Sequence, residues 1–252
     1  MYDAYNRREY VHPDPLELLF AYEDPGDLEI AALIAAVLAY GRVAQILLSV
    51  GTVLNGLQSG KRSSLRRSIE DAEPQELFER FRSFKHRFTT GSEISSLLVG
   101  IKLAIKAHGS LERLFVAGIG PNDDTILPAL AAFVERLRQL AGGPKACASL
   151  LSSPGDGSAC KRLNLFLRWM VRRDAVDPGP WTTVSPALLI VPLDTHLFRI
   201  AGRIGLTARR QADLKTAVEV TRKFAMLCPE DPVRYDFALT RLGINPLARD
   251  GG

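Results

Sequence analysis

A lysine at the start of an expected helix is the first residue whose type and position could do chemistry. Lys161 follows a turn with two closely spaced glycines, Gly155 and Gly157, and Ser158 is a suitable N-cap that would put Lys161 at the third helical position. Free backbone amides and the positive end of the helix dipole favour an anion such as a phosphate here. A lysine amine can also act as a covalent nucleophile. The alternative is a glycine-rich turn that leads into a surface helix with an exposed lysine.

Further basic residues follow on the same expected helix. Lys161, Arg168 and Arg172 are spaced by seven and then four residues, which places them on one helical face, and Arg162 and Arg173 flank them. No acidic residue lies between Lys161 and Arg173, and apolar residues occupy the opposite face. This basic strip predicts a helix that lies beside a nucleic-acid backbone. The alternative is an ordinary solvated helix face.

An aspartate opens another expected helix further along the chain. Asp194 follows Pro192 and stands just before an apolar stripe at helical spacing. Aspartate is a common N-cap, so Asp194 can have a purely structural role. The capping and catalytic roles are compatible, because one carboxylate oxygen can cap the helix while the other faces a cleft. His196 lies on the polar face of this helix, and because it has no His or Cys partner at ligand spacing we predict no metal site.

Helices must position these residues, because apolar side chains recur at helical spacing along almost the whole chain. The stretches with this pattern are residues 30–38, 43–57, 77–88, 94–105, 130–140, 163–171, 197–204, 214–226 and 232–242. Residues 61–67 predict a polar, basic turn. Residues 187–191 alone look strand-like, and they are too short to found a sheet.

Capping residues set the expected bounds of several of these helices. Asp27, then Asp123 or Asp124, and finally Asp231 are the expected N-caps of the stretches that begin near residues 30, 130 and 232. The expected C-terminal stops are glycines, namely Gly109, Gly142 with Gly143, Gly205 and Gly243.

A change of composition divides the chain. Gly, Pro and Ser dominate residues 142–157, which makes this segment the best hinge candidate. We therefore predict an all-α fold of two lobes with a cleft between them, built as a single unit over residues 1–252. A mostly helical bundle at residues 27–142 forms one lobe, and residues 143–252, which contain the glycine-rich turn, form the C-terminal lobe.

Composition and charge exclude several classes of protein. The 252 residues are 46% apolar and 24% charged, which favours a packed core over disorder. The net charge of +4 excludes an acidic carrier and permits a polyanionic partner. Three scattered cysteines fit neither a disulfide framework nor a metal-binding spacing, which favours a reducing, cytoplasmic setting. Residues 1–10 lack the apolar core of a signal peptide, and the longest uncharged apolar stretch, residues 30–40, is about half of the roughly 20 residues that a membrane span needs, so we predict no membrane partner.

Several of these motifs together resemble a known group of enzymes. A glycine-rich hairpin that leads into a helix with a lysine, followed by the run Pro-Leu-Asp-Thr-His-Leu-Phe-Arg, resembles the HhH-GPD superfamily of DNA glycosylases. The separation of 33 residues from Lys161 to Asp194 looks closer to the archaeal 8-oxoguanine glycosylase branch than to endonuclease III. Residues 39–42 are similar to the helix end that enters the DNA-facing loop in that superfamily. Residues 157–172 and 235–244 look like a mainly bacterial offshoot of the group.

The resemblance implies a mechanism without a metal or an organic cofactor. A damaged base would flip out of double-stranded DNA into the cleft. Asp194 would stabilise the positive charge that develops on the sugar and help to deprotonate the attacking amine. Lys161 would attack the anomeric carbon, expel the base and form a Schiff base, after which elimination could nick the strand, as in an AP lyase.

The resemblance also implies residues that bind the DNA. Asp236 would recognise the flipped base; its alternative role is a surface or capping carboxylate. Leu16 stands where the archaeal branch has a glutamine that reads the oxidised base. Arg42 and Gln45 are candidates for a wedge in the duplex, with helix-end solvation as the alternative for each. The full set of expected DNA contacts is Gly155, Gly157, Ser158, Arg162, Arg168, Arg42, Gln45 and His196.

Two functions of other classes fit the same residues. The first is a non-catalytic, nucleic-acid-binding helical module in which Lys161 is only a phosphate contact. The second is a protein-interaction module whose basic face meets an acidic partner. A covalent adduct with DNA separates the glycosylase from both, and the salt dependence of nucleic-acid binding separates the two others. The sequence predicts no particular oligomeric state.

Overall fold

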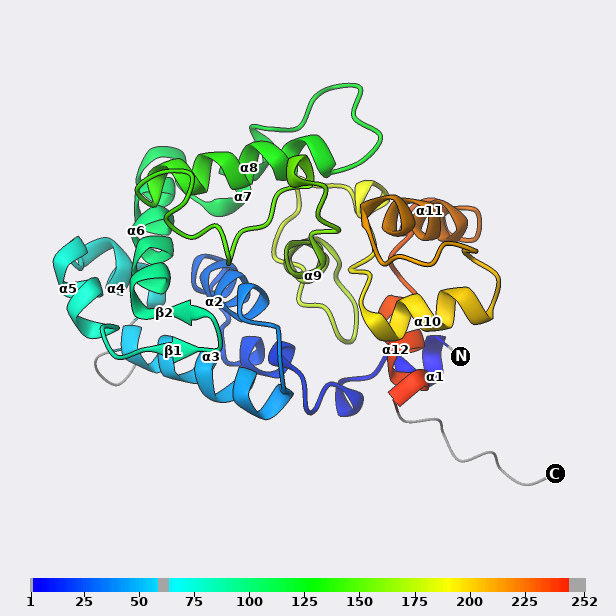
Figure 1. Cartoon of the computed structure of the whole chain (residues 1–252), viewed down its shortest axis with the longest axis horizontal. Helices are drawn as coiled ribbons and strands as arrows, with labels where there is room; N and C mark the ends of the chain where they lie inside the picture. Colours follow the sequence, from blue (N-terminus) through cyan, green and yellow to red (C-terminus); the bar gives the residue numbers. More distant parts are fainter. Residues whose placement is uncertain (1, 59–63, 245–252) are drawn as a thin grey trace.

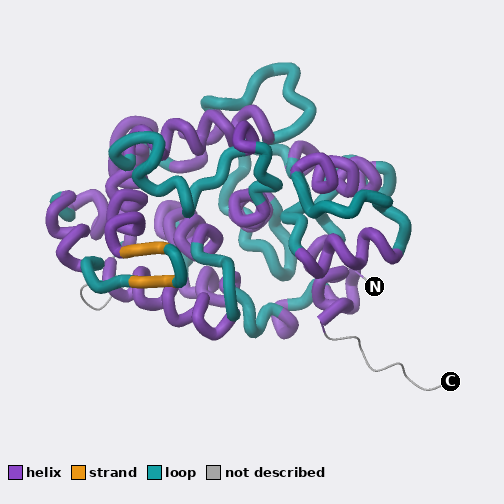
Figure 2. The backbone as a smooth tube through the Cα atoms, in the orientation of Figure 1, coloured by secondary structure: helices purple, strands orange, loops and turns teal. Residues whose placement is uncertain are grey.

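The computed structural model describes residues 2–58 and 64–244, which form a predominantly helical fold, as predicted (Figures 1 and 2). The α-helices are α1 (Tyr2–Tyr5), α2 (Pro25–Val37), α3 (Val43–Leu57), α4 (Leu65–Asp71), α5 (Pro74–Arg80), α6 (Gly91–His108), α7 (Leu111–Val116), α8 (Leu127–Leu140), α9 (Lys161–Val171), α10 (Thr195–Arg203), α11 (Leu214–Ala225) and α12 (Asp236–Ile244). Short 3-10 helices are η1 (Arg8–Tyr10), η2 (Pro15–Ala21), η3 (Pro154–Asp156) and η4 (Pro186–Leu188). The strands β1 (Lys85–His86) and β2 (Thr89–Thr90) pair antiparallel, with Lys85 opposite Thr90 and His86 opposite Thr89.

Helix α2 is the central element of the core, as its uniformly apolar sequence predicts. Residues 30–38 are all fully buried, and the helix packs against α3, α4 and α9. Asp24 caps it, since its side chain accepts hydrogen bonds from the backbone amides of Gly26 and Asp27 at 2.9 and 3.0 Å. The prediction that Asp27 is the cap is therefore wrong. Asp27 instead accepts a hydrogen bond from Ser64 Oγ at 2.7 Å and so ties the start of α2 to α4.

Most other helices occupy the predicted stretches, because their signals are local. Helix α3 has the predicted bounds. Helix α6 ends at Gly109, where a φ of +87° suits a glycine, and the turn after α10 contains Gly205 at +75°. Residues 61–63 of the predicted basic turn lie outside the described residues, and α4 takes up residues 65–67.

Other predicted caps are wrong, because the residues have different partners. Helix α8 begins after Ile126 without a side-chain cap, and Asp123 accepts a hydrogen bond from the Gly120 amide at 2.8 Å instead. Asp231 pairs with Arg172 and does not cap a helix. Helix α12 starts at residue 236 and continues through residue 244, so it does not stop at Gly243 as predicted.

The prediction of one helical stripe over residues 77–88 is also wrong. Helix α5 ends at Arg80, and the chain then forms the β1–β2 hairpin before α6 begins. Phe88 is 77% exposed at the tip of this hairpin, whereas Leu77 and Phe81 are buried. The predicted strand-like segment at residues 187–191 begins as the 3-10 helix η4 and pairs with no described strand.

The helices form two groups on either side of α2 and α9 (Figure 1). One group holds α3 to α8 with the small hairpin, and the other holds α10, α11 and α12. Helix α1 packs against α12, which brings the N-terminal residues to the C-terminal group. Residues 142–157, the hinge candidate of the sequence, are fixed to the rest of the fold at Leu151. This residue is buried, and its carbonyl accepts hydrogen bonds from the Arg138 side chain.

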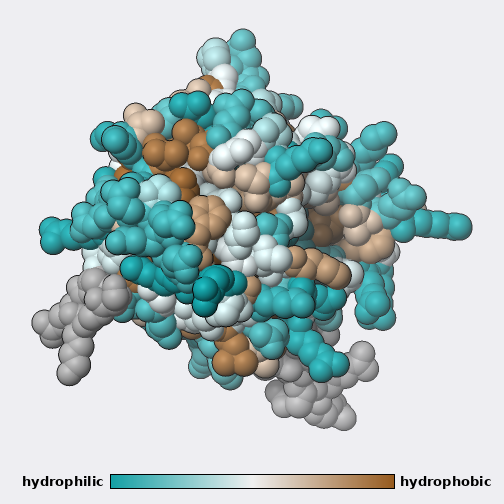
Figure 3. All heavy atoms as spheres, turned by 60° about the vertical axis from the view of Figure 1, so that its left-hand side comes forward, coloured by the Kyte–Doolittle hydropathy of each residue, from teal (hydrophilic) through white to brown (hydrophobic). Residues whose placement is uncertain are grey.

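No helix within residues 2–58 and 64–244 combines the length and the apolar character that a membrane crossing requires. On the face turned forward in Figure 3, apolar residues form small patches among hydrophilic ones.

Candidate functional site

Lys161 and Asp194 come together at one cavity. Lys161 Nζ lies 3.8 Å from Asp194 Oδ2, and both residues line a cavity of about 220 Å³. Lys161 is the first residue of α9 and Asp194 directly precedes α10, so the N-terminal ends of two helices meet here. Their side chains are 43% and 19% exposed, which leaves both open to a ligand. The predicted convergence of these two side chains on one cleft is confirmed.

Asp194 uses its two carboxylate oxygens differently. Oδ1 accepts a hydrogen bond from the backbone amide of Leu197 at 2.7 Å and thereby caps α10. Oδ2 is the oxygen next to the Lys161 amine. Pro192 and Leu193 are buried just before it and fix the approach of the chain. A capped carboxylate cannot turn freely, so its second oxygen is held toward the cavity.

The turn that delivers Lys161 differs in one respect from the prediction. Ser158 is not the N-cap of α9. Cys160 occupies that position in the left-handed region at φ +47°, and Ser158 Oγ accepts a hydrogen bond from its amide at 3.1 Å. Lys161 is therefore the first helical residue rather than the third. The Cys160 thiol donates to the carbonyl of Ser152 at 3.4 Å, which anchors this strained residue.

The glycine-rich turn itself is present. Residues 154–156 form η3, and Gly157 follows at a φ of +73° that a residue with a Cβ rarely adopts. Ser153 and Asp156 close the turn as a reciprocal capping box. Gly155 and Gly157 are exposed, so their backbone can be approached from solvent. Their contact with a DNA backbone stays a prediction.

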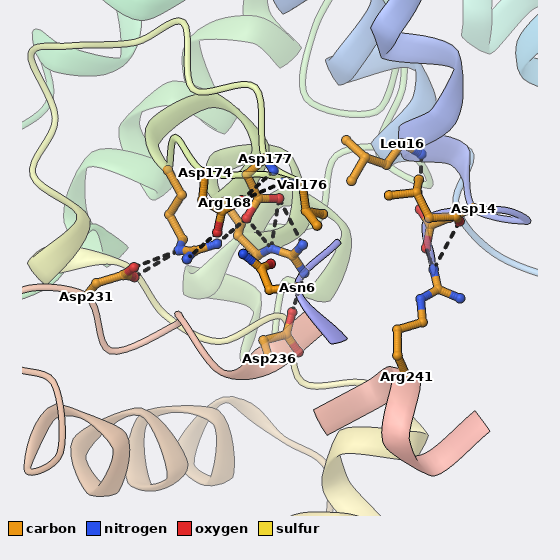
Figure 4. A network of polar contacts seen from close by, with 12 residues as sticks. Asn6, Asp14, Leu16, Arg168, Asp174, Val176, Asp177, Asp231, Asp236 and Arg241 are labelled. Atoms are coloured by element: carbon orange, nitrogen blue, oxygen red, sulfur yellow. Dashed lines mark hydrogen bonds and ion pairs between the residues drawn. The ribbon is translucent and has the colours of Figure 1, made fainter. Parts of the chain in front are cut away.

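The predicted basic strip on α9 is wrong. Arg168 and Arg172 are each only 3% exposed. Arg168 Nη2 lies 2.8 Å from Asp177 Oδ1, and its Nη1 lies 2.6 Å from Asp236 Oδ2. Arg172 pairs with Asp177 and with two further aspartates, Asp174 at 2.8 Å and Asp231 at 2.9 Å (Figure 4). This group of two arginines and four aspartates, the arginine–aspartate network, faces the protein interior and cannot lie along a DNA backbone.

We expect Asp177→Ala to destabilise the fold strongly. Asp177 is buried between the two arginines, and its removal leaves two desolvated guanidinium groups with fewer counter-charges. Breaking a buried pair in this way costs about 3–5 kcal/mol of unfolding free energy, measured by urea denaturation. The matched control is Glu70→Ala, which removes an exposed pair with Arg66 at 2.9 Å and should cost less than about 0.5 kcal/mol. Equal losses in the two variants would contradict a structural role for the network.

Arg162 is also not free to contact DNA. Its Nη1 donates to the carbonyl of Val37 and its Nη2 to the carbonyl of Ser149, both at 2.6 Å. The guanidinium group lies over the Tyr40 ring, 5.1 Å from the centroid, and burial lowers its pKa. Arg162 thus joins the end of α2 to the segment before α9, and the predicted DNA contact is corrected to a structural one.

Asp236 lies at the inner wall of the cavity. It is 4% exposed, and its Oδ2 accepts the hydrogen bond from Arg168. Burial, opposed by Arg168 and reinforced by the negative charge of Asp194, raises the pKa of the Asp236 carboxyl to about 6. The carboxyl can therefore exist in either protonation state near pH 6, and it can donate or accept a hydrogen bond there. The alternative of a surface carboxylate for Asp236 is wrong.

The raised pKa of Asp236 predicts how stability changes with pH. Its folded-state pKa lies above the ordinary value of 3.8, so the native protein binds more protons than the unfolded chain between about pH 4 and 6. The unfolding free energy of the wild type, relative to Asp236→Asn, should therefore fall across this window by up to roughly 3 kcal/mol and stay constant above it. Urea denaturation of both proteins at several pH values checks this. A relative stability that rises with pH would contradict the raised pKa.

A second charged pair lines the same cavity, and sequence reasoning missed it. Arg241 Nη2 lies 2.6 Å from Asp14 Oδ2, and Asp14 Oδ1 accepts a hydrogen bond from the Leu16 amide at 3.0 Å (Figure 4). Arg241 Nε is buried without a hydrogen-bond partner. The two residues stand near opposite ends of the chain, so no local spacing links them. Leu16, where the resemblance places a base-reading glutamine, is 1% exposed and packs in the core.

The remaining predicted DNA contacts lie on the surface. Arg42 is the exposed N-cap residue of α3, and Gln45 is exposed one turn later, where its Nε2 donates to Ser49 Oγ at 3.2 Å. His196 is exposed on the first turn of α10. Gly41, next to Arg42, lines the cavity, so Arg42 stands at its edge. Their contacts with DNA stay predictions.

The described residues offer no group of three or more His, Cys, Asp or Glu side chains placed to hold a metal ion. The three cysteines are buried free thiols, and burial raises the pKa of Cys147 to about 11. An anionic thiolate is thereby disfavoured at this position.

Comparison with known proteins assigns the chain to a family. A family model described as "Protein of unknown function (DUF2400)" matches residues 14–245, and the chain belongs to this family. The matched range contains every residue that lines the cavity of Lys161 and Asp194. No curated protein and no solved structure matches the chain.

Proposed function

We propose that this protein is a DNA glycosylase that excises a damaged base with Lys161 as the nucleophile, and that it can also nick the abasic strand. The observation that carries the proposal is the 3.8 Å approach of the Lys161 amine to Asp194 Oδ2 at a cavity. A nucleophilic amine next to a carboxylate is the pair that imine-forming base excision requires. The resemblance to the HhH-GPD superfamily assigns the same two residues to these roles.

The chemistry can be written for the groups present. The neutral Lys161 amine attacks the anomeric carbon of the sugar, a carbon–nitrogen bond forms, and the glycosidic bond breaks. The departing base takes the bonding electrons, and it takes up the proton that Asp194 Oδ2 has received from the amine. Asp194 Oδ2 stabilises the positive charge on the sugar and accepts the proton that the amine gives up. Opening of the sugar ring then yields a Schiff base, from which elimination breaks the strand.

The cavity wall supports the binding of a flipped base. It combines ring and aliphatic surface from Tyr40, Leu165 and Phe237 with the polar groups of Asp236 and Thr240. Stacking surface and hydrogen-bonding groups are what a pocket for an extruded nucleobase needs. The carboxyl of Asp236, whose pKa is about 6, offers a donor or an acceptor to the edge of the base.

The protein-interaction module loses its main support, because it depended on a basic face of α9 and Arg168 and Arg172 are buried in the arginine–aspartate network. The binding module keeps Lys161 as a phosphate contact. A lysine that only contacts phosphate does not need a capped aspartate whose second oxygen points at its amine. Catalysis does need that arrangement, and so the glycosylase is the function that we propose.

Reductive trapping tests the proposal. The protein is mixed with duplexes that carry an oxidised base, a deaminated base or an abasic site, and borohydride is added to reduce any Schiff base to a stable adduct. We expect a covalent adduct with the abasic duplex and with at least one of the damaged duplexes, and none with undamaged DNA. Tight binding to the abasic duplex without any adduct would overturn the proposal and favour a binding module.

A further inference from the structure

The tip of the β1–β2 hairpin presents an aromatic side chain to solvent. Phe88 is 77% exposed, and the Arg87 guanidinium lies 5.5 Å from the centroid of its ring. Large exposed aromatic groups are unfavourable in water, so they are often part of a binding surface. Neither the fold nor the reaction proposed above uses Phe88.

The hairpin is fixed to the wall of the cavity. Tyr40, which lines the cavity, donates its hydroxyl to the His86 carbonyl at 2.9 Å and lies 2.7 Å from Thr89 Oγ1. The His86 ring is fully buried and bonds in turn to the Tyr40 carbonyl at 3.0 Å and to Ser49 Oγ at 2.9 Å. These bonds join both strands to the segment after α2 and to α3. The hairpin that carries Phe88 is thus held by hydrogen bonds to a residue that lines the cavity, and it lies beside α3 (Figure 1).

The conformation of the tip brings it against the edge of the cavity. Arg87 has a φ of +53°, in the left-handed region that non-glycine residues avoid. Its side chain packs against Gly41, where an added Cβ would lie 2.9 Å from Arg87 Cδ. Gly41 itself lines the cavity. Strain of this kind persists where the surroundings hold it, and it is frequent at functional sites.

The surroundings of Phe88 are basic. Arg82, Lys85 and Arg87 are exposed on or next to the hairpin, and Arg42 is exposed at the start of α3. No acidic residue occurs between Arg82 and Thr90, although Arg82 Nη1 lies 3.8 Å from Glu79 Oε2 and Glu93 accepts a hydrogen bond from the Thr90 amide at 2.9 Å. The sequence predicted a positive surface on α9. Among the described residues, exposed basic side chains instead lie at this hairpin and at the start of α3. This positive surface suits the phosphates of a duplex.

From these observations we infer that Phe88 is the side chain that enters the DNA duplex and fills the gap left by the flipped nucleotide. This inference rests on the proposed function, because it assumes that a nucleotide leaves the stack. Apolar side chains inserted between base pairs unstack them, and an aromatic ring can replace the stacking that is lost. Arg87 and Lys85 contact the flanking phosphates. Arg42 and Gln45, the wedge candidates of the sequence, lie on α3 and contact the strands without entering the stack.

Phe88→Ala, compared with two other variants, tests this role. Phe88→Leu keeps an apolar side chain. Met226→Ala is the matched control, since Met226 is also 77% exposed and lies at the C-terminal end of α11. Two quantities are measured for each. One is the rate of borohydride trapping on an abasic duplex relative to the single strand. The other is the affinity for a duplex with a tetrahydrofuran abasic analogue relative to an intact duplex, which requires no chemistry.

We expect Phe88→Ala to lower both ratios by about tenfold, with single-strand trapping unchanged. Phe88→Leu should recover part of the loss, and Met226→Ala should behave as the wild type. If Phe88→Ala keeps both ratios while the wild type traps DNA, the wedge is overturned and the glycosylase stands. If the wild type neither traps nor prefers the abasic analogue, the proposed function falls and the wedge with it. A Phe88→Ala protein that loses single-strand trapping as well would show general damage to the site and would also overturn the wedge.

Discussion

Lys161→Ala should eliminate the borohydride-trapped adduct on abasic and damaged duplexes. The adduct requires a primary amine at the anomeric carbon, and Lys161 is the lysine that lies against Asp194 in the cavity. Duplex affinity should change little, because the other exposed basic residues near the cavity, such as Arg42 and Lys85, remain. The measurement is the yield of trapped adduct on a denaturing gel beside the dissociation constant for the same duplex. Alanine at the first helical position is compatible with α9, so the fold should persist.

A second lysine provides the control for this result. Lys106 is exposed on α6 and does not line the cavity, so Lys106→Ala should trap DNA as the wild type does. Adduct that persists at the wild-type level in Lys161→Ala would assign the nucleophile to another amine, even if the protein is a glycosylase. Loss of the adduct in both variants would indicate that the chemistry depends on overall charge and not on a particular amine.

The elements that the sequence predicted well are those whose signals lie within a few residues. Helix α6 ends at the predicted stop, Gly109, and α10 begins directly after the predicted cap, Asp194. Because an N-cap must accept from an amide two or three residues later, Asp194 could be placed at a helix start from the sequence alone. The same cap explains why its second oxygen is held at the cavity.

The prediction of a basic strip was wrong because the acidic partners of its arginines lie outside residues 161–173. Residues 161–173 contain no acidic residue, but Asp174 and Asp177 follow them closely in the sequence. Asp236, which pairs with Arg168, belongs to α12 and is distant in the sequence. Helical spacing places Arg168 on a face, but it does not say what packs on that face. The arginines are neutralised by tertiary pairing, which the linear sequence does not display.

Long-range pairings likewise explain the parts of the cavity that were missed. Asp14 and Arg241 form an ion pair although nearly the whole chain separates them in sequence. Tyr40 and His86, which are 46 positions apart, are joined by hydrogen bonds. The apolar residues of 77–88 do fit a helical period. In the structure, however, the buried His86 ring bonds to the Tyr40 carbonyl, and the chain reverses direction directly after His86 in the β1–β2 hairpin. Phe88 is thereby left exposed, which no periodicity predicts.

Asp194→Asn separates a catalyst from a helix cap. Asparagine caps a helix about as well as aspartate, so the hydrogen bond to Leu197 and the stability of α10 should be retained. The variant lacks the negative charge that stabilises a cationic sugar and the base that takes the proton from the amine. We expect the single-turnover rate of base excision to fall by roughly a hundredfold or more, with the dissociation constant for the duplex nearly unchanged.

The matched control for Asp194 is another capping aspartate of this chain. Asp213 caps α11 in the same way, since its Oδ1 accepts a hydrogen bond from the Thr216 amide at 2.9 Å, and it does not line the cavity. Asp213→Asn should leave both excision and thermal stability at wild-type levels. If Asp194→Asn is also fully active, its carboxylate serves only as a cap, and the short distance to Lys161 has no part in the reaction. A fall in rate only for Asp194→Asn, with equal melting temperatures, would show that the reaction requires the charge of the Asp194 carboxylate, because both aspartates cap their helices through Oδ1 and only Asp194 lines the cavity.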